Sequence, residues 1–411
     1  MKIAFVVPYV PNRVRTRSYN LIAHLANLGH EVDVFTVGTG MEDLADAEAL
    51  RSKCRNVFYY KQPVWLSLLN SAFAIPSSKP LQSVYSLQQD LIDHLTKAFK
   101  RREWGSEYDI AHIEHLRGSE YGRILKTDCP SLPVVWDSVD CISHLFRQAA
   151  GQSTSLFGRL ASRFELERTQ KTEAMLLQIF DHVLVTSNAD RNALMERADD
   201  TVTSSPISIL SNGVDRDYFK PNPEVVKEPD TLIFSGKMSY HANISMVKYL
   251  VNRIMPLIWR RRPNVRLFVV GKDPSSEIKR MAENPRIIVT GTVSDIRPFL
   301  WKSTVAVAPL VYGAGVQNKI LEAMAVGLPV VTTSRAILSL NVTPGRDVRI
   351  GDTPSEFSAG VLNLLENADL RQEVGQAGHM YVIANHDWMR ISEQLVSIYY
   401  RSMMVLKENF A

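Results

Sequence analysis

The stretch Pro309–Val331 gives the strongest structural signal in the chain, because it predicts a strand, a glycine loop, a helix and a second strand in direct succession. Thr304–Leu310 is a short apolar run, which is typical of a strand buried on both faces. Val316–Val326 carries apolar residues on one helical face, and Gly327 followed by a proline predicts the end of that helix. The stretch therefore predicts a βαβ unit of a parallel sheet.

The loop inside this unit has the composition of an anion site. Gly313 and Gly315 allow the backbone to approach a ligand closely, and the helix that follows presents its unpaired N–H groups to a phosphate. Lys319, one turn into the helix, would add positive charge, and Glu322 near the same face would suit a vicinal diol such as a nucleotide ribose. The alternative is an ordinary buried crossover in which Glu322 caps a neighbouring element.

The block that starts at Glu322, Glu-Ala-Met-Ala-Val-Gly-Leu-Pro-Val-Val, resembles the nucleotide-binding segment of the retaining glycosyltransferases of family 4, which have the GT-B fold. The resemblance implies that Glu322 binds the donor ribose and that the Gly313–Val316 amides contact the donor diphosphate. Ala314 stands where the family usually has a second Glu, which faces the donor sugar. Residues 315–319, Gly-Val-Gln-Asn-Lys, resemble a subgroup without that Glu, so we interpret Ala314 as variation rather than loss of activity.

The pattern of alternating strands and helices begins at Ile3–Val7 and starts again at Thr231–Ser235. With the resemblance, this predicts an α/β chain of the GT-B class, with two doubly wound Rossmann-like domains facing across a cleft. We expect residues 1–205 to form an acceptor-side domain and residues 206–386 a domain that binds the nucleotide sugar. A helix in residues 387–411 is expected to cross back onto the first domain.

A second donor segment is predicted at Gly236–Lys237, because the basic residue after this glycine contacts the donor diphosphate in the family. Relatives usually carry another Lys shortly afterwards, where this chain has His241-Ala-Asn243, and we expect Lys319 to compensate. The first loop of the chain also departs from the family, which often has glycines there.

Three arginines take the place of those glycines, namely Arg13, Arg15 and Arg17. They follow the carboxyl end of the first strand, where open α/β sheets bind ligands. We therefore predict that Arg15 and Arg17 contribute charge to the donor diphosphate. The alternative is that they are solvated surface arginines.

Catalytic residues are predicted at the end of the strand Tyr108–Glu114, which resembles the Asp-x-x-His-x-His region of the family. His112 matches the first His, and Glu114 matches the second, which faces the donor sugar. His115 follows directly. We expect Glu114 to stay ionised and to bind sugar or acceptor hydroxyls, or to accept the acceptor proton if burial raises its pKa. If the register is shifted by one residue, His115 is the catalytic-site His.

Apolar and basic residues suggest contact with a membrane. The segment Gln62–Tyr85 is predicted to be irregular and contains an apolar run at Trp65–Phe73, and Lys97–Arg102 forms a basic cluster on a predicted helix, Leu87–Arg101. Together these features predict peripheral docking on an anionic membrane surface. The alternative is a lid that packs on its own domain and has a solvated charged face.

The bulk composition excludes several classes of protein. The 411 residues are enough for two or three domains, and the formal net charge of +4 is too small to indicate nucleic acid as a partner. The three cysteines show no metal or redox spacing, so a reducing cytoplasm fits, and we expect neither a metal nor another cofactor. The N-terminus does not resemble a signal peptide, and no apolar run could span a bilayer. We expect a cytoplasmic protein that reaches the inner face of the membrane.

Together these patterns predict a hexosyltransferase that moves a sugar from a nucleoside-diphosphate sugar to an acceptor hydroxyl and retains the anomeric configuration. Its pathway would be the synthesis of a polysaccharide, a glycolipid or a glycosylated metabolite. Two alternatives stay open, a GT-B sugar-nucleotide epimerase and a nucleotide-sugar-binding protein without catalytic activity.

Overall fold

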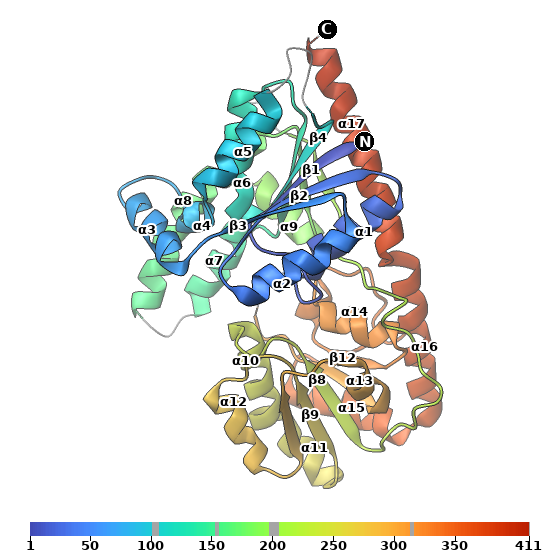
Figure 1. Cartoon of the computed structure of the whole chain (residues 1–411). Coiled ribbons are helices and arrows are strands. Elements are labelled where there is room, and N and C mark those ends of the chain that lie inside the picture. The colour runs from blue at the N-terminus through green and yellow to red at the C-terminus, as the bar shows by residue number, and fades with distance from the viewer. Residues whose placement is uncertain (101–106, 153–155, 197–204, 313–315, 411) are drawn as a thin grey trace. The chain divides into compact units, whose positions relative to one another are not determined.

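The computed structural model describes residues 1–410 except 101–106, 153–155, 197–204 and 313–315. The chain divides into two compact units, which Figure 1 shows in colours that follow the sequence. The first unit contains Met1–Ser211 together with Trp388–Ala411, and the second contains Asn212–Asp387. Each unit is an α/β structure built on one parallel sheet.

The first sheet has seven strands in the order β3-β2-β1-β4-β5-β6-β7. The strand order reverses between β1 and β4, and ligands of open parallel sheets bind beyond the carboxyl ends of the strands at such a point. The strands are β1 (Lys2–Val7), β2 (Glu31–Gly38), β3 (Asn56–Lys61), β4 (Ile110–Glu114), β5 (Val134–Val139), β6 (His182–Val185) and β7 (Ile207–Ile209).

The helices of the first unit connect these parallel strands. The C-terminal helix packs on the same unit, where its Trp388, Leu395 and Tyr399 join a core that contains Leu21 of the first helix. The helices are α1 (Thr16–Asn27), α2 (Met41–Leu50), α3 (Val64–Ala74), α4 (Leu81–Tyr85), α5 (Gln89–Lys100), α6 (His115–Asp128), α7 (Ile142–Gln152), α8 (Leu156–Ile179), α9 (Asn188–Met195) and α17 (Trp388–Phe410), with a short 3-10 helix at Arg51–Lys53.

The second sheet has six parallel strands in the order β10-β9-β8-β11-β12-β13. It repeats the strand order of the first sheet, with the reversal between β8 and β11. The strands are β8 (Thr231–Ser235), β9 (Arg266–Val270), β10 (Ile287–Gly291), β11 (Val305–Ala308), β12 (Val330–Thr332) and β13 (Arg349–Ile350).

The helices of the second unit include the one predicted after the glycine loop. They are α10 (His241–Tyr249), α11 (Met255–Arg261), α12 (Ser276–Arg280), α13 (Arg297–Lys302), α14 (Asn318–Ala325), α15 (Pro354–Glu366) and α16 (Ala368–Asn385). A π-helical turn, Leu250–Ile254, joins α10 to α11, and 3-10 turns lie at Met281–Glu283 and Ser334–Ile337.

The helix α14 lies between β11 and β12, as the sequence predicted. Its Ile320, Leu321 and Met324 are fully buried in the core of the second unit. The helix starts at Asn318 rather than at the predicted Val316, because Gln317 has the extended backbone of an N-cap residue.

Two predictions about the first unit are wrong. The predicted boundary after residue 205 falls before β7, which pairs with β6 and therefore belongs to the first sheet. The segment Gln62–Tyr85, predicted to be irregular, contains α3 and α4. Pro63 and Pro80 occupy the N-cap positions of these helices, where the missing N–H group breaks no helical hydrogen bond. Over the residues that the structure describes, no helix is both long and apolar enough to cross a membrane.

Candidate functional site

Two glycine turns approach each other at the carboxyl edge of the second sheet. Gly236 follows β8 with φ +147° and Gly271 follows β9 with φ +150°. A Cβ atom on Gly271 would lie 1.8 Å from the carbonyl oxygen of Gly236, and the Gly236 amide donates to the Val270 carbonyl at 3.0 Å. Because a side chain would not fit here, only backbone atoms occupy this part of the edge, next to the start of α14.

Lys319 of α14 reaches this turn. Its Nζ donates to Asn243 Oδ1 at 3.1 Å and to Gln317 Oε1 at 3.3 Å, and it lies 5.5 Å from the centroid of the Phe234 ring. Burial lowers the pKa of Lys319 to about 8, while the nearby Glu322 carboxylate acts in the opposite direction. The structure thus brings the predicted Lys319 and Gly236 together.

Glu322 lies one helical turn further along α14. Burial raises the pKa of this carboxyl to about 7, and the positive charge of Lys319 lowers it. Among the described residues, none donates a hydrogen bond to the Glu322 carboxylate. This carboxylate can therefore accept hydrogen bonds from ligand hydroxyls.

The remaining donor residues predicted in this unit have different positions. Gly313, Ala314 and Gly315 lie outside the described residues. The Val316 side chain is half-buried and packs against the core, so only its backbone can serve a ligand. Lys237 is half-exposed, and its Nζ lies 3.9 Å from Asp273 Oδ2, a long surface ion pair that leaves the ammonium accessible.

Sequence reasoning missed the contacts that fix Tyr312, the residue directly before the glycine loop. The Tyr312 ring stacks on His241 of α10 with centroids 5.5 Å apart and planes at 6°. The Tyr312 hydroxyl lies 2.9 Å from His241 Nδ1 and accepts a hydrogen bond from Ser245 Oγ at 3.2 Å. These contacts attach the start of the loop to α10, and no local sequence pattern could have indicated them.

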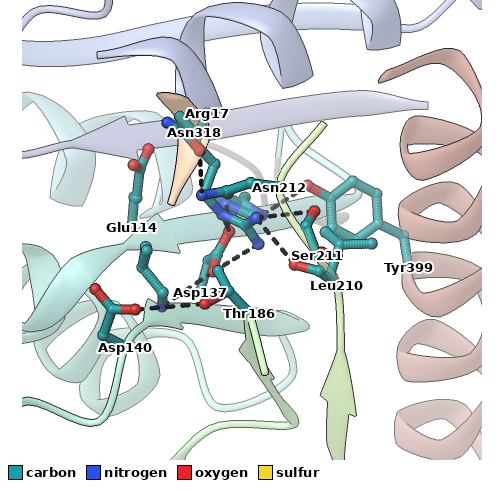
Figure 2. A network of polar contacts seen from close by, with 12 residues as sticks. Arg17, Glu114, Asp137, Asp140, Thr186, Leu210, Ser211, Asn212, Asn318 and Tyr399 are labelled. Carbon is teal, nitrogen blue, oxygen red and sulfur yellow. Dashed lines mark hydrogen bonds and ion pairs between the residues drawn. The ribbon is translucent and has the colours of Figure 1, made fainter. Parts of the chain in front are cut away.

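In the first unit, Arg17 is buried beneath the carboxyl edge of the sheet (Figure 2). Its Nε and Nη2 donate to Asp137 at 2.8 and 3.1 Å, and its Nη1 donates to the carbonyls of Leu210 and Ser211 at 2.9 and 3.3 Å. This geometry does not support the donor contact predicted for Arg17, because the fold itself uses the guanidinium. The helix α1 starts at Thr16 and places Arg17 on its buried side.

Arg15 remains near the surface. Its Nη1 donates to the Val10 carbonyl at 3.0 Å and lies 3.5 Å from Asp43 Oδ1, and the side chain is 42% exposed. The guanidinium also lies 5.2 Å from the centroid of the Tyr9 ring. A ligand at the first loop could therefore still contact Arg15, and also Arg13, which is exposed in the same loop.

Glu114 ends β4 and is 1% exposed. The Tyr9 hydroxyl donates to one of its carboxylate oxygens, and within the described residues the other oxygen is buried without a hydrogen-bond partner. Burial, and then the negative charge of Asp137, raise the pKa of Glu114 to about 7. Of the two expectations for this group, the shift favours the second, in which burial raises the pKa of Glu114 and lets it accept a proton.

The two neighbouring histidines differ. His112 is fully buried, stacks on Phe5 with ring centroids 4.1 Å apart, and its Nδ1 lies 2.8 Å from the Tyr399 hydroxyl. Burial lowers the pKa of His112 to about 4, so it is a neutral core histidine. Its Nε2 lies 3.6 Å from Asp137 Oδ2, but a neutral imidazole forms no ion pair with that carboxylate. The catalytic role predicted for His112 has no support in this geometry.

His115 lies where the chain turns from β4 into α6, with φ +64°. Its Nδ1 accepts the Arg117 backbone N–H at 3.3 Å, and its carbonyl accepts the Trp136 indole N–H, also at 3.3 Å. Burial lowers the pKa of His115 to about 4. The turn, with its left-handed backbone, fixes His115 at the start of α6 directly after Glu114.

Sequence reasoning also missed the residues that surround Glu114. Asp137 lies close enough to Glu114 for its negative charge to raise the pKa of that carboxyl. Asp140 belongs to the same polar network (Figure 2), and burial and the neighbouring Asp190 raise its pKa to about 7. Tyr9 gave no local signal. Within the described ranges, no group of three His, Cys, Asp or Glu side chains is placed to hold a metal ion.

Comparisons with known proteins identify the class. Residues 14–218 match the family model described as Glycosyltransferase Family 4, and residues 229–367 match the one described as Glycosyl transferases group 1. Sucrose-phosphate synthase from Thermosynechococcus elongatus has a similar structure, with a TM-score of 0.69 and 18% identity over 98% of this chain and 100% of that one. Anabaena HepE in complex with UDP-glucose gives a TM-score of 0.67 and 15% identity, again over 98% and 100%.

One protein with a similar sequence is also a glycosyltransferase. Phosphatidyl-myo-inositol mannosyltransferase from Propionibacterium freudenreichii is 31% identical over 150 residues, which cover 35% of this chain and 37% of that protein. An uncharacterized 44.6 kDa protein in the cps region of Klebsiella pneumoniae is 20% identical over 375 residues, 89% of this chain and 90% of that protein. The fold is that of a GT-B glycosyltransferase. More specifically, the chain belongs to glycosyltransferase family 4.

The buried ion pair of the first unit generates a test. Arg17→Leu leaves Asp137 buried without its bidentate partner, so we expect the free energy of unfolding to fall by about 3–5 kcal/mol. Arg15→Leu, at a half-exposed arginine nearby, should change it by less than about 1 kcal/mol. Urea denaturation measures both, and equal stability of the two variants would contradict the structural role of Arg17.

Proposed function

We propose that this chain is a retaining glycosyltransferase that moves a hexosyl group from a nucleoside-diphosphate sugar to an acceptor hydroxyl. The observation that carries the proposal is the pair of Lys319 and Glu322 on α14, next to the Gly236 turn. This pair offers a cation for a diphosphate and a free carboxylate for a ribose. The solved complex of HepE with UDP-glucose supports a nucleotide sugar as the donor.

In this proposal the second unit activates the leaving group. Negative charge develops on the diphosphate as the bond to the sugar breaks, and Lys319 and Lys237 stabilise that charge more in the transition state than in the ground state. The amides of residues 313–316 add hydrogen bonds at the helix N-terminus. Because the lysines supply the positive charge, we expect no requirement for a metal or another cofactor.

The first unit holds the acceptor in this proposal. The bond between the sugar C1 and the diphosphate oxygen breaks, and a bond between C1 and the acceptor oxygen forms on the same face, which retains the configuration. The acceptor proton passes to the departing diphosphate, or to Glu114 when this group is ionised. Tyr9 orients the Glu114 carboxyl through its hydrogen bond, and Arg15 contacts the donor diphosphate.

The acceptor belongs to the synthesis of a polysaccharide, a glycolipid or a glycosylated metabolite in the cytoplasm. The relative from a cps region supports a polysaccharide, and the mannosyltransferase supports a lipid-linked acceptor. The comparisons do not favour the epimerase or the inactive binding protein. Turnover of donor without an acceptor would indicate an epimerase, and donor binding without any transfer would indicate the binding protein.

Membrane contact is a further part of the proposal, and the structure changes its basis. The helix α3 directly follows the carboxyl end of β3, whereas Phe99 near the end of α5 packs on Tyr108, just before β4 begins. The apolar run therefore follows the carboxyl end of the sheet, whereas Lys97 lies on the helix that leads back to the opposite end. The described residues do not support a joint apolar and basic surface. Lys100 to Arg102 fall outside the described side chains.

What remains is one apolar helix face, which we call the α3 face. The segment Val64–Ala74 contains no charged residue, and Arg168 of α8 holds its end by donating to the Ala74 carbonyl at 3.1 Å. We propose that this face lies in the interfacial layer of a membrane. Its exposed side chains are Val64, Trp65, Leu68, Leu69, Phe73 and Ile75.

The ribose contact is tested at Glu322. Glu322→Gln keeps the shape but removes the charged acceptor, and hydrogen bonds to charged groups contribute about 1.5–3 kcal/mol each. We expect the donor nucleotide to bind about 10- to 100-fold more weakly, with unchanged folding, by titration calorimetry. Glu366→Gln, at an exposed position on α15, serves as the control. Equal affinities of parent and Glu322→Gln would remove Glu322 from the site.

The proton acceptor is tested at Glu114. Its pKa of about 7 means that the carboxylate form is lost as the pH falls through 7, so the turnover number should decline below neutrality. Glu114→Gln should lower the turnover number by about 100-fold, abolish that acidic decline and leave nucleotide affinity intact. His115→Ala should have a smaller effect. Normal turnover in Glu114→Gln combined with loss in His115→Ala would assign the role to His115.

Vesicle sedimentation tests the α3 face. The protein should sediment with lipid vesicles at both low and high salt, because apolar burial is not screened by ions. Trp65→Ser with Phe73→Ser should abolish sedimentation without loss of folding, and Lys97→Glu, on α5, should not. If high salt releases the protein and Lys97→Glu prevents binding, the contact is electrostatic and the α3 proposal fails.

A further inference from the structure

One buried amide connects the two predicted donor segments of the second unit. Asn243 of α10 is 6% exposed, and its Oδ1 accepts a hydrogen bond from Lys319 Nζ at 3.1 Å. Its Nδ2 donates to the Lys237 carbonyl at 2.9 Å. A Cβ atom on Gly236 would lie 2.7 Å from this Nδ2, so the glycine allows the amide to approach the turn.

We propose that Asn243 is a positioning residue that holds the Lys319 ammonium at the glycine turn, where the donor diphosphate binds. The inference rests on the proposed function for the identity of that anion. In this proposal Lys319 of α14 supplies the cation, and Asn243 of α10 supplies the hydrogen-bond acceptor that fixes its position.

The chemistry of the amide suits this task. Both described acceptors of the Lys319 ammonium, Asn243 and Gln317, are neutral amides, so they orient the cation without cancelling its charge. A carboxylate at position 243 would form a buried ion pair and leave little positive potential for a diphosphate. Burial already disfavours the charged form of Lys319, so these two hydrogen bonds also help to keep the ammonium protonated.

The same geometry would allow α10, rather than α14, to supply the positive charge. Because Asn243 Oδ1 lies 3.1 Å from the ammonium, a Lys side chain at position 243 can place its own ammonium near the same point. The inference therefore predicts that the position of the charge matters, and not which helix supplies it.

Relocation of the charge tests the inference, with inorganic diphosphate as the probe in titration calorimetry. Lys319→Met should weaken diphosphate binding about 10- to 100-fold, the range for loss of one hydrogen bond to a charged group. Adding Asn243→Lys to Lys319→Met should recover most of that loss. Lys248→Met, at an exposed lysine of α10 that pairs with Glu277 at 2.7 Å, is the matched control and should bind as the parent does.

A second variant keeps the test decisive if the double variant fails to fold. Asn243→Asp preserves the acceptor oxygen and the size of the side chain, yet we expect it to weaken diphosphate binding about 10-fold, because the carboxylate neutralises Lys319. Binding equal to the parent in Asn243→Asp, a folded double variant no better than Lys319→Met, or no diphosphate binding by the parent would each overturn the inference.

Sugar transfer is measured separately, so the two proposals can fail independently. If the parent transfers no sugar but diphosphate binding follows the expected order, the proposed function fails and the cation site stands. If transfer occurs while diphosphate binding ignores Lys319 and Asn243, the function stands and this inference fails.

Discussion

Each unit removes charged side chains from water at the carboxyl edge of its sheet, and the cost of that desolvation determines what the charges can do. An unpaired buried ion is so unfavourable that it either finds a partner or shifts its pKa until it becomes neutral. In the first unit Arg17 and Asp137 satisfy each other through two hydrogen bonds. Arg17, the buried cation of the network in Figure 2, therefore stabilises the fold rather than contacting a ligand.

Glu114 lies near the Arg17–Asp137 ion pair but is not part of it. With Arg17 engaged by Asp137, the same Asp137 adds to burial in raising the pKa of Glu114, and Arg17 only partly offsets the effect. The neighbouring His112 is neutral for the same reason, because burial lowers its pKa to about 4. Glu114 thus has a pKa near neutrality, as Asp140 also has, whereas the neighbouring His112 stays neutral. A pKa near neutrality is what a proton-accepting group needs.

The sequence predicted the fold well because the fold depends on local periodicity. Apolar runs at the strands and the one-sided helix after the glycine loop are visible within a few residues, and the turn at His115 follows from where β4 ends. The site is different, because its contacts join distant positions. Arg17 and Asp137 are 120 residues apart, and Tyr399 meets His112 across 287 positions. Periodicity shows which side chains are buried and not which of them meet.

Residue type alone was misleading where the role depended on the side of a helix. Arg15 and Arg17 are two residues apart, yet the start of α1 at Thr16 leaves the first half-exposed and buries the second. The prolines misled for a related reason, since Pro63 and Pro80 begin helices instead of interrupting them. In both cases the residue type was identified correctly, and the position relative to a helix start decided its effect.

The second unit meets the desolvation constraint differently, because it leaves the charges incompletely paired. Lys319 and Glu322 each favour the charged form of the other, yet burial still moves the pKa of the first down to about 8 and of the second up to about 7. A diphosphate near Lys319 would stabilise the ammonium, and ribose hydroxyls donating to Glu322 would stabilise the carboxylate. The ligand therefore supplies the interactions that the folded chain lacks. The stabilisation of the ammonium and the carboxylate that appears only with the ligand contributes to affinity, less the cost of ordering and desolvating the groups that meet.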